Sequence, residues 1–266
     1  MEKLKPNVCI LKADGINCDE ELAHAYNIES VGGNAKIVHI NELKNKERTL
    51  SKYQILAIPG GFSYGDDIAA GKILAIELNA YLADEMNEFV QRQKGLILGI
   101  CNGFQVLTRT GLLPFGTIDA MKATLANNES GHFDCRWINL KAEQNSKCVF
   151  LDGLGEQMQL QYTVAHGEGK FYAKPHSLSK IENDGLVVFR YCDVAGNPTQ
   201  EYPTNPNGSL NAIAGICDPS GHILGLMPHP ERFVRREQHP NFRRDQTIQP
   251  HGLPLFEKMV SYVKEM

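Results

Sequence analysis

Residues 96–105 read LILGICNGFQ, an apolar run that ends in a cysteine between two glycines. The segment 95–100 predicts a buried strand, and residues 103–109 fit a short helix. A strand that turns sharply into a helix, with a nucleophile on the turn, is a nucleophile elbow. Gly99 and Gly103 are the small neighbours that such a turn needs, and Cys101 is then the candidate nucleophile.

A structural cysteine packed beside two glycines would give the same pentapeptide, because short motifs recur by chance. The predicted strand before Cys101 and the helix after it favour the catalytic interpretation. In that setting the helix N-terminus stabilises a thiolate, and the N–H of Asn102 points to where an oxyanion would form.

The first half of the chain alternates strands with helices. Strands are predicted at 8–12, 36–40, 53–58 and 95–100, with helices at 19–31 and 73–90. This order predicts a mostly parallel central sheet flanked by helices, with functional residues at the carboxyl ends of its strands.

The second half predicts an antiparallel extension of the same sheet. Its short apolar runs are separated by turns rich in Gly, Pro and Asn. The predicted strands are 133–140, 159–164, 186–191, 211–217 and 223–226, and a closing helix spans 253–263. With no repeat or linker in view, we expect one α/β domain over residues 1–266.

Composition and charge exclude several classes of protein. The 266 residues are 42% hydrophobic and 22% charged, with a formal net charge of −4. These values are typical of a globular protein that binds no nucleic acid over its whole surface. The apolar runs are too short to span a bilayer and the N-terminus lacks a signal peptide, so we expect a cytoplasmic protein. The seven cysteines are scattered without a CxxC pair, which predicts reduced thiols and no zinc site.

A candidate base follows the predicted strand 223–226 in the sequence MPHPE. Flanking prolines hold this segment extended, and residues two apart then face the same side. Glu231 can therefore accept a hydrogen bond from one ring nitrogen of His229 while the other nitrogen faces Cys101. The alternative is a histidine that merely caps a surface loop, and the elbow cysteine at another strand end weighs against it.

A second oxyanion donor is expected just after the strand 53–58, in Pro59-Gly60-Gly61-Phe62. Glycines there let the backbone N–H of Gly61 approach a substrate closely. Most Gly-Gly pairs are simple turns, but this pair lies at the carboxyl end of a strand, where function gathers.

Five segments together resemble the class I, or triad, glutamine amidotransferases. They are GICNGFQ at 99–105, PHPE at 228–231, PGGFSYGDD at 59–67, VAHGEGKF at 164–171 and NCDEE at 17–21. FSYGDD and AHGEG narrow the resemblance to the glutaminase subunits of phosphoribosylformylglycinamidine synthase. The similarity runs from the first predicted strand to the last helix. One departure is Asp14-Gly15-Ile16, where the family often carries Pro-Gly-Thr, and it concerns the loop around Asn17.

The resemblance implies that glutamine is hydrolysed to glutamate and ammonia. Cys101 would attack the amide, His229 would move protons and Glu231 would orient the imidazole. The backbone amides of Gly61 and Asn102 would form the oxyanion hole. Residues near the bound glutamine would be Gly60, Gln105, Ala165, His166, Gly167 and Glu168.

The family also implies partners. The ammonia would pass to a synthetase subunit, which uses ATP and magnesium to make phosphoribosylformylglycinamidine from formylglycinamide ribonucleotide in purine biosynthesis. A small third subunit often bridges the two. No cofactor or metal is expected on this chain. Asp66 and Asp67 could suggest a metal pair, but adjacent acids without other ligands are usually solvated or bonded to backbone.

Two other functions compete. A stand-alone cysteine hydrolase, such as a peptidase or deglycase, would also use a cysteine elbow, but PHPE and PGGFSYGDD match amidotransferases. A non-catalytic interaction subunit would not need Cys101, His229 and Glu231 intact.

The segment 231–245 is rich in arginine and admits two interpretations that the sequence leaves open. It is either a docking surface for the synthetase, since arginine is favoured at interfaces, or a solvated loop with internal ion pairs. A nucleic-acid site is disfavoured because the chain is net acidic. The arginines are Arg232, Arg235, Arg236, Arg243 and Arg244.

Overall fold

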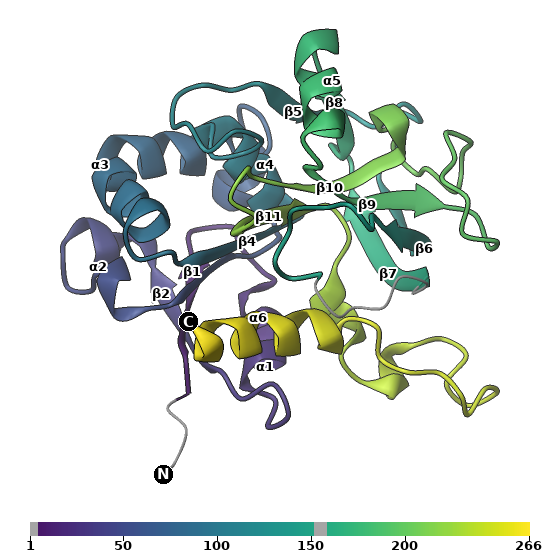
Figure 1. Ribbon diagram of the computed structural model, residues 1–266, viewed down its shortest axis with the longest axis horizontal. Helices are drawn as coiled ribbons and strands as arrows, with labels where there is room; N and C mark the ends of the chain where they lie inside the picture. The colour runs from purple at the N-terminus through teal and green to yellow at the C-terminus, as the bar shows by residue number, and fades with distance from the viewer. Residues whose placement is uncertain (1–4, 152–158) are drawn as a thin grey trace.

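A nine-stranded sheet crosses the molecule, in the order β2-β1-β3-β4-β11-β10-β9-β6-β7 (Figure 1). The computed structural model describes residues 5–151 and 159–266. The first five strands in this order are mutually parallel. They are β2 (Asn34–His39), β1 (Asn7–Lys12), β3 (Ile55–Ile58), β4 (Leu96–Ile100) and β11 (Ile223–Leu226).

The sheet then continues antiparallel, as the sequence predicted for the second half. The strands of this part are β10 (Ile213–Cys217), β9 (Val187–Cys192), β6 (Asp134–Ala142) and β7 (Gln159–His166). A separate two-stranded sheet pairs β5 (Ala123–Ala126) with β8 (Lys170–Ala173). The predicted α/β class, with a parallel part and an antiparallel extension, is therefore confirmed.

The position of β11 corrects the sequence interpretation. The sequence predicts this strand in the antiparallel extension, but it pairs parallel with β4 and antiparallel with β10. All four residues of β11 are buried and apolar. A short apolar run of this kind does not indicate which strands lie beside it in the sheet. Because parallel strands end at the same edge, β11 brings the segment after Leu226 next to the turn after β4.

Helices cover both faces of the parallel part. In Figure 1, α1 and α6 lie together on one side of the sheet, and α3 and α4 lie on the other. Two short helices, α2 and α5, were not predicted from the sequence. The helices are α1 (Asp19–Asn27), α2 (Ile40–Lys44), α3 (Lys72–Gln91), α4 (Asn102–Thr110), α5 (Pro175–Asn183) and α6 (Leu253–Glu265).

The apolar core is continuous beneath both halves of the sheet and includes residues of every strand in it. Helix α6 closes one face, where Phe256 meets the edge of Tyr26 with ring centroids 5.0 Å apart. The Tyr26 hydroxyl also contacts the sulfur of Met259 at 3.1 Å. Within the described residues, no helix combines the length and apolarity needed to cross a membrane.

The closing helix offers a test of this packing. Replacing the fully buried Phe256 by Ala removes its contact with Tyr26 and leaves a cavity against α1. We expect the free energy of unfolding to fall by about 3–5 kcal/mol, measured by urea denaturation. Ser261→Ala, on the exposed side of the same helix, should change it by less than about 0.5 kcal/mol. Equal effects of the two substitutions would contradict this packing.

Candidate active site

Cys101 occupies the turn between β4 and α4 with φ 52° and ψ −106°, a backbone conformation that residues other than glycine rarely adopt. Its N–H donates to Leu226 O of β11 at 2.8 Å, and its carbonyl accepts from Phe104 N and Gln105 N. The strained backbone of a nucleophile elbow is therefore present. Helix α4 begins at Asn102, one residue before the prediction, and its first N–H groups have no partner within the helix.

Close packing explains the two glycines of the elbow. A Cβ on Gly103 would lie 2.0 Å from the carbonyl oxygen of Ile58 in β3. A Cβ on Gly99 would lie 2.5 Å from Leu107 and 2.7 Å from the carbonyl oxygen of Gly103. Helix α4 thus starts in direct contact with the strand ends, and any side chain at Gly103 would push the helix and Cys101 away.

His229 and Glu231 form the pair that the sequence predicted. Nδ1 of His229 and Oε1 of Glu231 are 2.6 Å apart, and both side chains are buried. The backbone differs from the expectation, because only His229 is extended and a 3₁₀ turn, Pro230–Phe233, begins at the next residue. The N–H of His229 donates to Thr163 O of β7 at 2.8 Å, which anchors the histidine before that turn.

The electrostatics of His229 favour a protonated imidazole. Burial alone would lower its pKa, but the charge of Glu231 and the neighbouring sulfur of Cys101 outweigh burial and raise the pKa well above its usual value. Nε2 of His229 is buried and has no hydrogen-bond partner among the described residues. The Cys101 sulfur lies 3.7 Å from Ala165 O.

Gly60 lies between the candidate nucleophile and base. A Cβ at this position would sit 2.8 Å from Cε1 of His229 and 3.3 Å from Cβ of Cys101. Any side chain at Gly60 would therefore crowd the space between Cys101 and His229.

Gly61 has φ 133° and packs against the loop that follows β1. A Cβ there would meet Asn17 N at 2.7 Å and Gly15 O at 2.9 Å. The next residue, Phe62, donates its N–H to Gly15 O at 3.0 Å. The loop around Asn17, where the sequence departs from the family it resembles, thus supports the backbone of Gly61.

The side chain of Asn102 holds the loop after Gly61 against the elbow. Its Oδ1 accepts from the Ser63 hydroxyl at 2.7 Å, and its Nδ2 donates to Asp66 at 3.1 Å and to Gln105 at 2.9 Å. Asp66 also accepts from the N–H of Gly71 at 3.2 Å, and its partial burial raises its pKa. Sequence reasoning had not assigned Ser63 and Asp66 this role, although they lie within the family signature FSYGDD.

Gln105 and Glu168 join the elbow to the AHGEG segment. Nε2 of Gln105 donates to the carbonyl oxygen of Glu168 at 2.5 Å, and Gln105 is almost fully buried. The Glu168 carboxylate accepts from Ala70 N at 3.3 Å and lies 3.9 Å from the guanidinium of Arg109. Both polar ends of Gln105 are thus engaged inside the protein, and its role at the bound glutamine stays a prediction.

His166 lies in a polar network of its own. Nδ1 contacts Asn128 Oδ1 at 3.1 Å, Nε2 lies 3.4 Å from the amide of Asn207, and the ring is buried. Burial, with the charge of His229, lowers the pKa of His166 to about 4. The imidazole is therefore neutral near pH 7 and braces the loop that contains Gly167.

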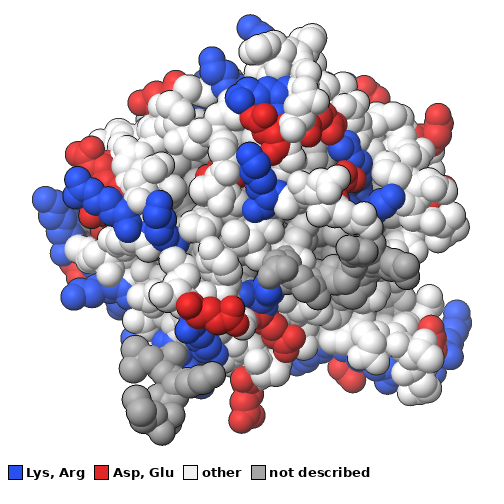
Figure 2. Space-filling model, in the orientation of Figure 1, with Lys and Arg blue, Asp and Glu red and all other residues white. Residues whose placement is uncertain are grey.

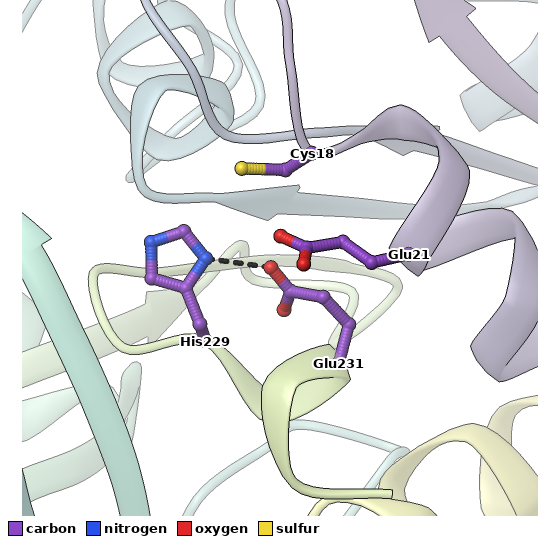
Figure 3. A group of neighbouring side chains, drawn as sticks. All are labelled: Cys18, Glu21, His229 and Glu231. Atoms are coloured by element: carbon purple, nitrogen blue, oxygen red, sulfur yellow. Dashed lines mark hydrogen bonds and ion pairs between the residues drawn. The ribbon is translucent and has the colours of Figure 1, made fainter. Parts of the chain in front are cut away.

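Cys18 and Glu21 lie beside the His229–Glu231 pair, which the sequence did not reveal. Figure 3 shows both side chains reaching from the start of α1 toward these residues. One possible ligand atom from each of the four residues lies within 4.8 Å of the others. Among the described residues, these four side chains are the cluster that could hold a metal ion. The only sequence signal was the NCDEE segment, which gave no hint of which atoms would meet.

Comparison with known proteins decides the family. Residues 5–263 match the family model of the CobB/CobQ-like glutamine amidotransferase domain. The phosphoribosylformylglycinamidine synthase subunit PurQ of Dehalococcoides mccartyi is 44% identical, over 100% of both chains. The chain belongs to the PurQ family of glutamine amidotransferases. The PurQ subunit of Archaeoglobus fulgidus is 38% identical, again over 100% of both chains.

Solved structures agree with this family. A chain in the structure of PurLQS from Thermotoga maritima is 30% identical, with a TM-score of 0.72 and coverage of 97% of this chain and 99% of that one. Another glutamine amidotransferase from Thermotoga maritima is 15% identical, has a TM-score of 0.55, and covers 99% and 100% of the two chains. This second match supports the fold alone. The resemblance to PurQ that the motifs indicated is therefore confirmed.

The raised pKa of His229 gives a prediction for this site. Glu231→Gln removes the carboxylate charge but leaves the burial, so the pKa of His229 should fall below that of the parent protein. The measurement is an NMR titration of the imidazole nitrogens from about pH 5 to about pH 10 in a Cys101→Ser background, which removes the sulfur from both samples.

The raised pKa of His229 also makes the stability of the fold depend on pH. Protonated His229 contributes its full stabilisation below about pH 6.5, the pKa of an unperturbed histidine. That contribution is lost as the pH rises through the raised pKa of the folded state. With Glu231→Gln, that loss should move to lower pH. An unchanged His229 titration would show that Glu231 does not set the charge of the ring.

Proposed function

We propose that this chain releases ammonia from the side-chain amide of glutamine at Cys101 and supplies it to a synthetase that makes phosphoribosylformylglycinamidine. The observation that carries the proposal is that the Cys101 elbow and the buried His229–Glu231 pair lie next to one another around Gly60. PurQ family membership supplies the substrate class and the pathway, purine biosynthesis.

The chemistry follows from the free atoms at the site. The Cys101 sulfur, having given its proton to Nε2 of His229, attacks the amide carbon of glutamine, and the carbonyl oxygen becomes an oxyanion. The backbone N–H groups of Asn102 and Gly61 are the proposed donors to it, because Asn102 opens α4 and its N–H has no helical partner. Nε2 of His229 then gives its proton to the leaving nitrogen, and ammonia departs from a thioester.

Hydrolysis of the thioester restores the enzyme. Neutral His229 takes a proton from water, the hydroxide attacks the thioester carbon, and glutamate leaves as the Cys101 thiol is regenerated. Glu231 keeps Nδ1 protonated, so Nε2 is the nitrogen that exchanges protons. Gly60, Gln105, Ala165, His166, Gly167 and Glu168 are the proposed surroundings of the bound glutamine. Among them Gln105 and His166 are proposed to act by holding the loops.

The proposed partners are a synthetase subunit and a small bridging subunit. The support is the Thermotoga maritima relative, whose structure is described as PurLQS. ATP and magnesium are proposed to bind the synthetase and not this chain. We also infer that residues 1–266 form one domain, since one sheet spans both halves, although 1–4 and 152–158 lie outside the described residues. The proposed location is the cytoplasm.

The arginine-rich segment keeps both of its interpretations. Arg232 pairs with Glu21, and Arg236 donates to backbone oxygens of its own loop at Phe242 and Asp245, which favours internal pairing. Three others are exposed and available for docking: Arg235, Arg243 and Arg244. Figure 2 shows Lys and Arg interspersed with Asp and Glu over the face in view, without the broad basic surface that nucleic acid would need.

A first test is covalent labelling. An electrophilic analogue of glutamine, such as a chloroketone, should modify Cys101 alone, and excess glutamine should block the reaction. Peptide mass spectrometry locates the adduct. Cys135 is the internal control, because it is the exposed cysteine of the chain and should react with iodoacetamide without protection by glutamine. An adduct elsewhere, or no adduct with the synthetase present, would contradict the proposed nucleophile.

A second test separates ammonia release from ammonia use. In a complex assembled with Cys101→Ala, synthesis of the amidine from glutamine should fall at least about 1000-fold, because the thioester cannot form. Synthesis from added ammonium chloride should stay near the level of the unmodified complex, because the synthetase is untouched. Both rates are read from ADP release. Glutamine-dependent synthesis that survives Cys101→Ala would rule out this mechanism.

A further inference from the structure

Two carboxylates lie close together behind the proposed triad. Glu231 is buried, with Oε1 on His229 and Oε2 without a hydrogen-bond partner among the described residues. Figure 3 shows the Glu21 carboxylate pointing at it from α1, and their nearest ligand-type oxygens are no more than 4.8 Å apart. Two like charges at this distance repel one another. Unopposed repulsion would push the Glu231 carboxylate out of its place against the His229 ring.

Arg232 supplies a positive charge at this point. Its Nε donates to Glu21 Oε1 at 2.9 Å, and its Nη2 donates to the Cys18 sulfur at 3.1 Å. The guanidinium is partly exposed, and so is the Glu21 carboxylate. Arg232 follows Glu231 directly in the chain. One turn therefore places both the Glu231 carboxylate and the guanidinium that pairs with Glu21.

The cluster also has the ligand types that zinc prefers, namely a thiol, an imidazole and two carboxylates. Two of these four groups, Cys18 and Glu21, already receive hydrogen bonds from Arg232. Burial and the charge of Glu231 raise the pKa of the Cys18 thiol, which favours its neutral form. The cation that faces Cys18 and Glu21 is therefore the guanidinium of Arg232.

We propose that Arg232 is a positioning residue of the glutaminase, a role that rests on the function proposed above. By compensating the charge of Glu21, Arg232 keeps the Glu231 carboxylate in place against His229. Arg232 itself touches neither Cys101 nor the proposed oxyanion donors in the contacts of the described residues. The effect should therefore fall on the chemical step and not on glutamine binding.

The test compares four variants in the assembled synthase complex. Arg232→Gln leaves Glu21 unopposed, and we expect kcat for glutamine hydrolysis to fall about tenfold while KM changes less than about twofold. Arg232→Lys restores a charge and should stay within about threefold of the parent. Glu21→Gln removes the repulsion and should also stay within about threefold. The double variant Glu21→Gln/Arg232→Gln should recover most of the loss.

A matched control is Arg92→Gln, which removes an exposed arginine at the end of α3, paired only with Glu88 among the described residues, and should leave kcat unchanged. Rescue by Glu21→Gln distinguishes charge compensation from a simple tether, because a tether would be lost in the double variant too. A double variant as slow as Arg232→Gln would therefore overturn the proposal. A rise in KM with kcat intact would overturn it as well, and would place Arg232 in glutamine binding.

Folding failure is covered by the conservative substitution. If Arg232→Gln does not assemble, Arg232→Lys decides: a rate within about threefold supports the proposal, and a tenfold loss in an assembled complex contradicts it. Failure of the proposed function would look different, because the parent complex would then show no hydrolysis of glutamine.

Discussion

The close contact between the start of α4 and the ends of β3 and β4 is the constraint on which the site depends. Gly103 lies so near Ile58 O that no side chain fits, and this contact holds Cys101 in its left-handed turn. From that turn the Asn102 side chain reaches the loop of Ser63 and Asp66. A change in the position of helix α4 would therefore move two parts of the site together, namely the proposed nucleophile and the loop that carries a proposed oxyanion donor.

Strand β11 brings the proposed base next to the proposed nucleophile. Strand β11 lies between the parallel and antiparallel parts, so it can end beside β4 while its chain neighbour, β10, belongs to the second half of the protein. This arrangement brings His229 to Cys101 without a long mobile segment. The same arrangement places the Glu21 carboxylate close to Glu231, and Arg232 pairs with Glu21 there.

Much of the parallel half could be predicted from sequence, because its strands are short apolar runs separated by amphipathic helices. Four of its strands and two long helices were placed within a few residues of their observed ends. The short elements were missed for a physical reason. Strands β5 and β8 have four residues each, and they exist only because they pair with one another across a long stretch of chain.

The sequence by itself determined the nucleophile elbow, the His229–Glu231 pair and the family, since each depends on residues close together in the chain. Only the tertiary structure decided how these segments meet. It placed β11 beside β4, joined Gln105 and His166 to internal hydrogen bonds, and placed Glu21 and Arg232 beside the proposed triad. Contacts between residues more than 200 positions apart leave no local pattern in a single sequence, because they depend on how strands order themselves in the sheet.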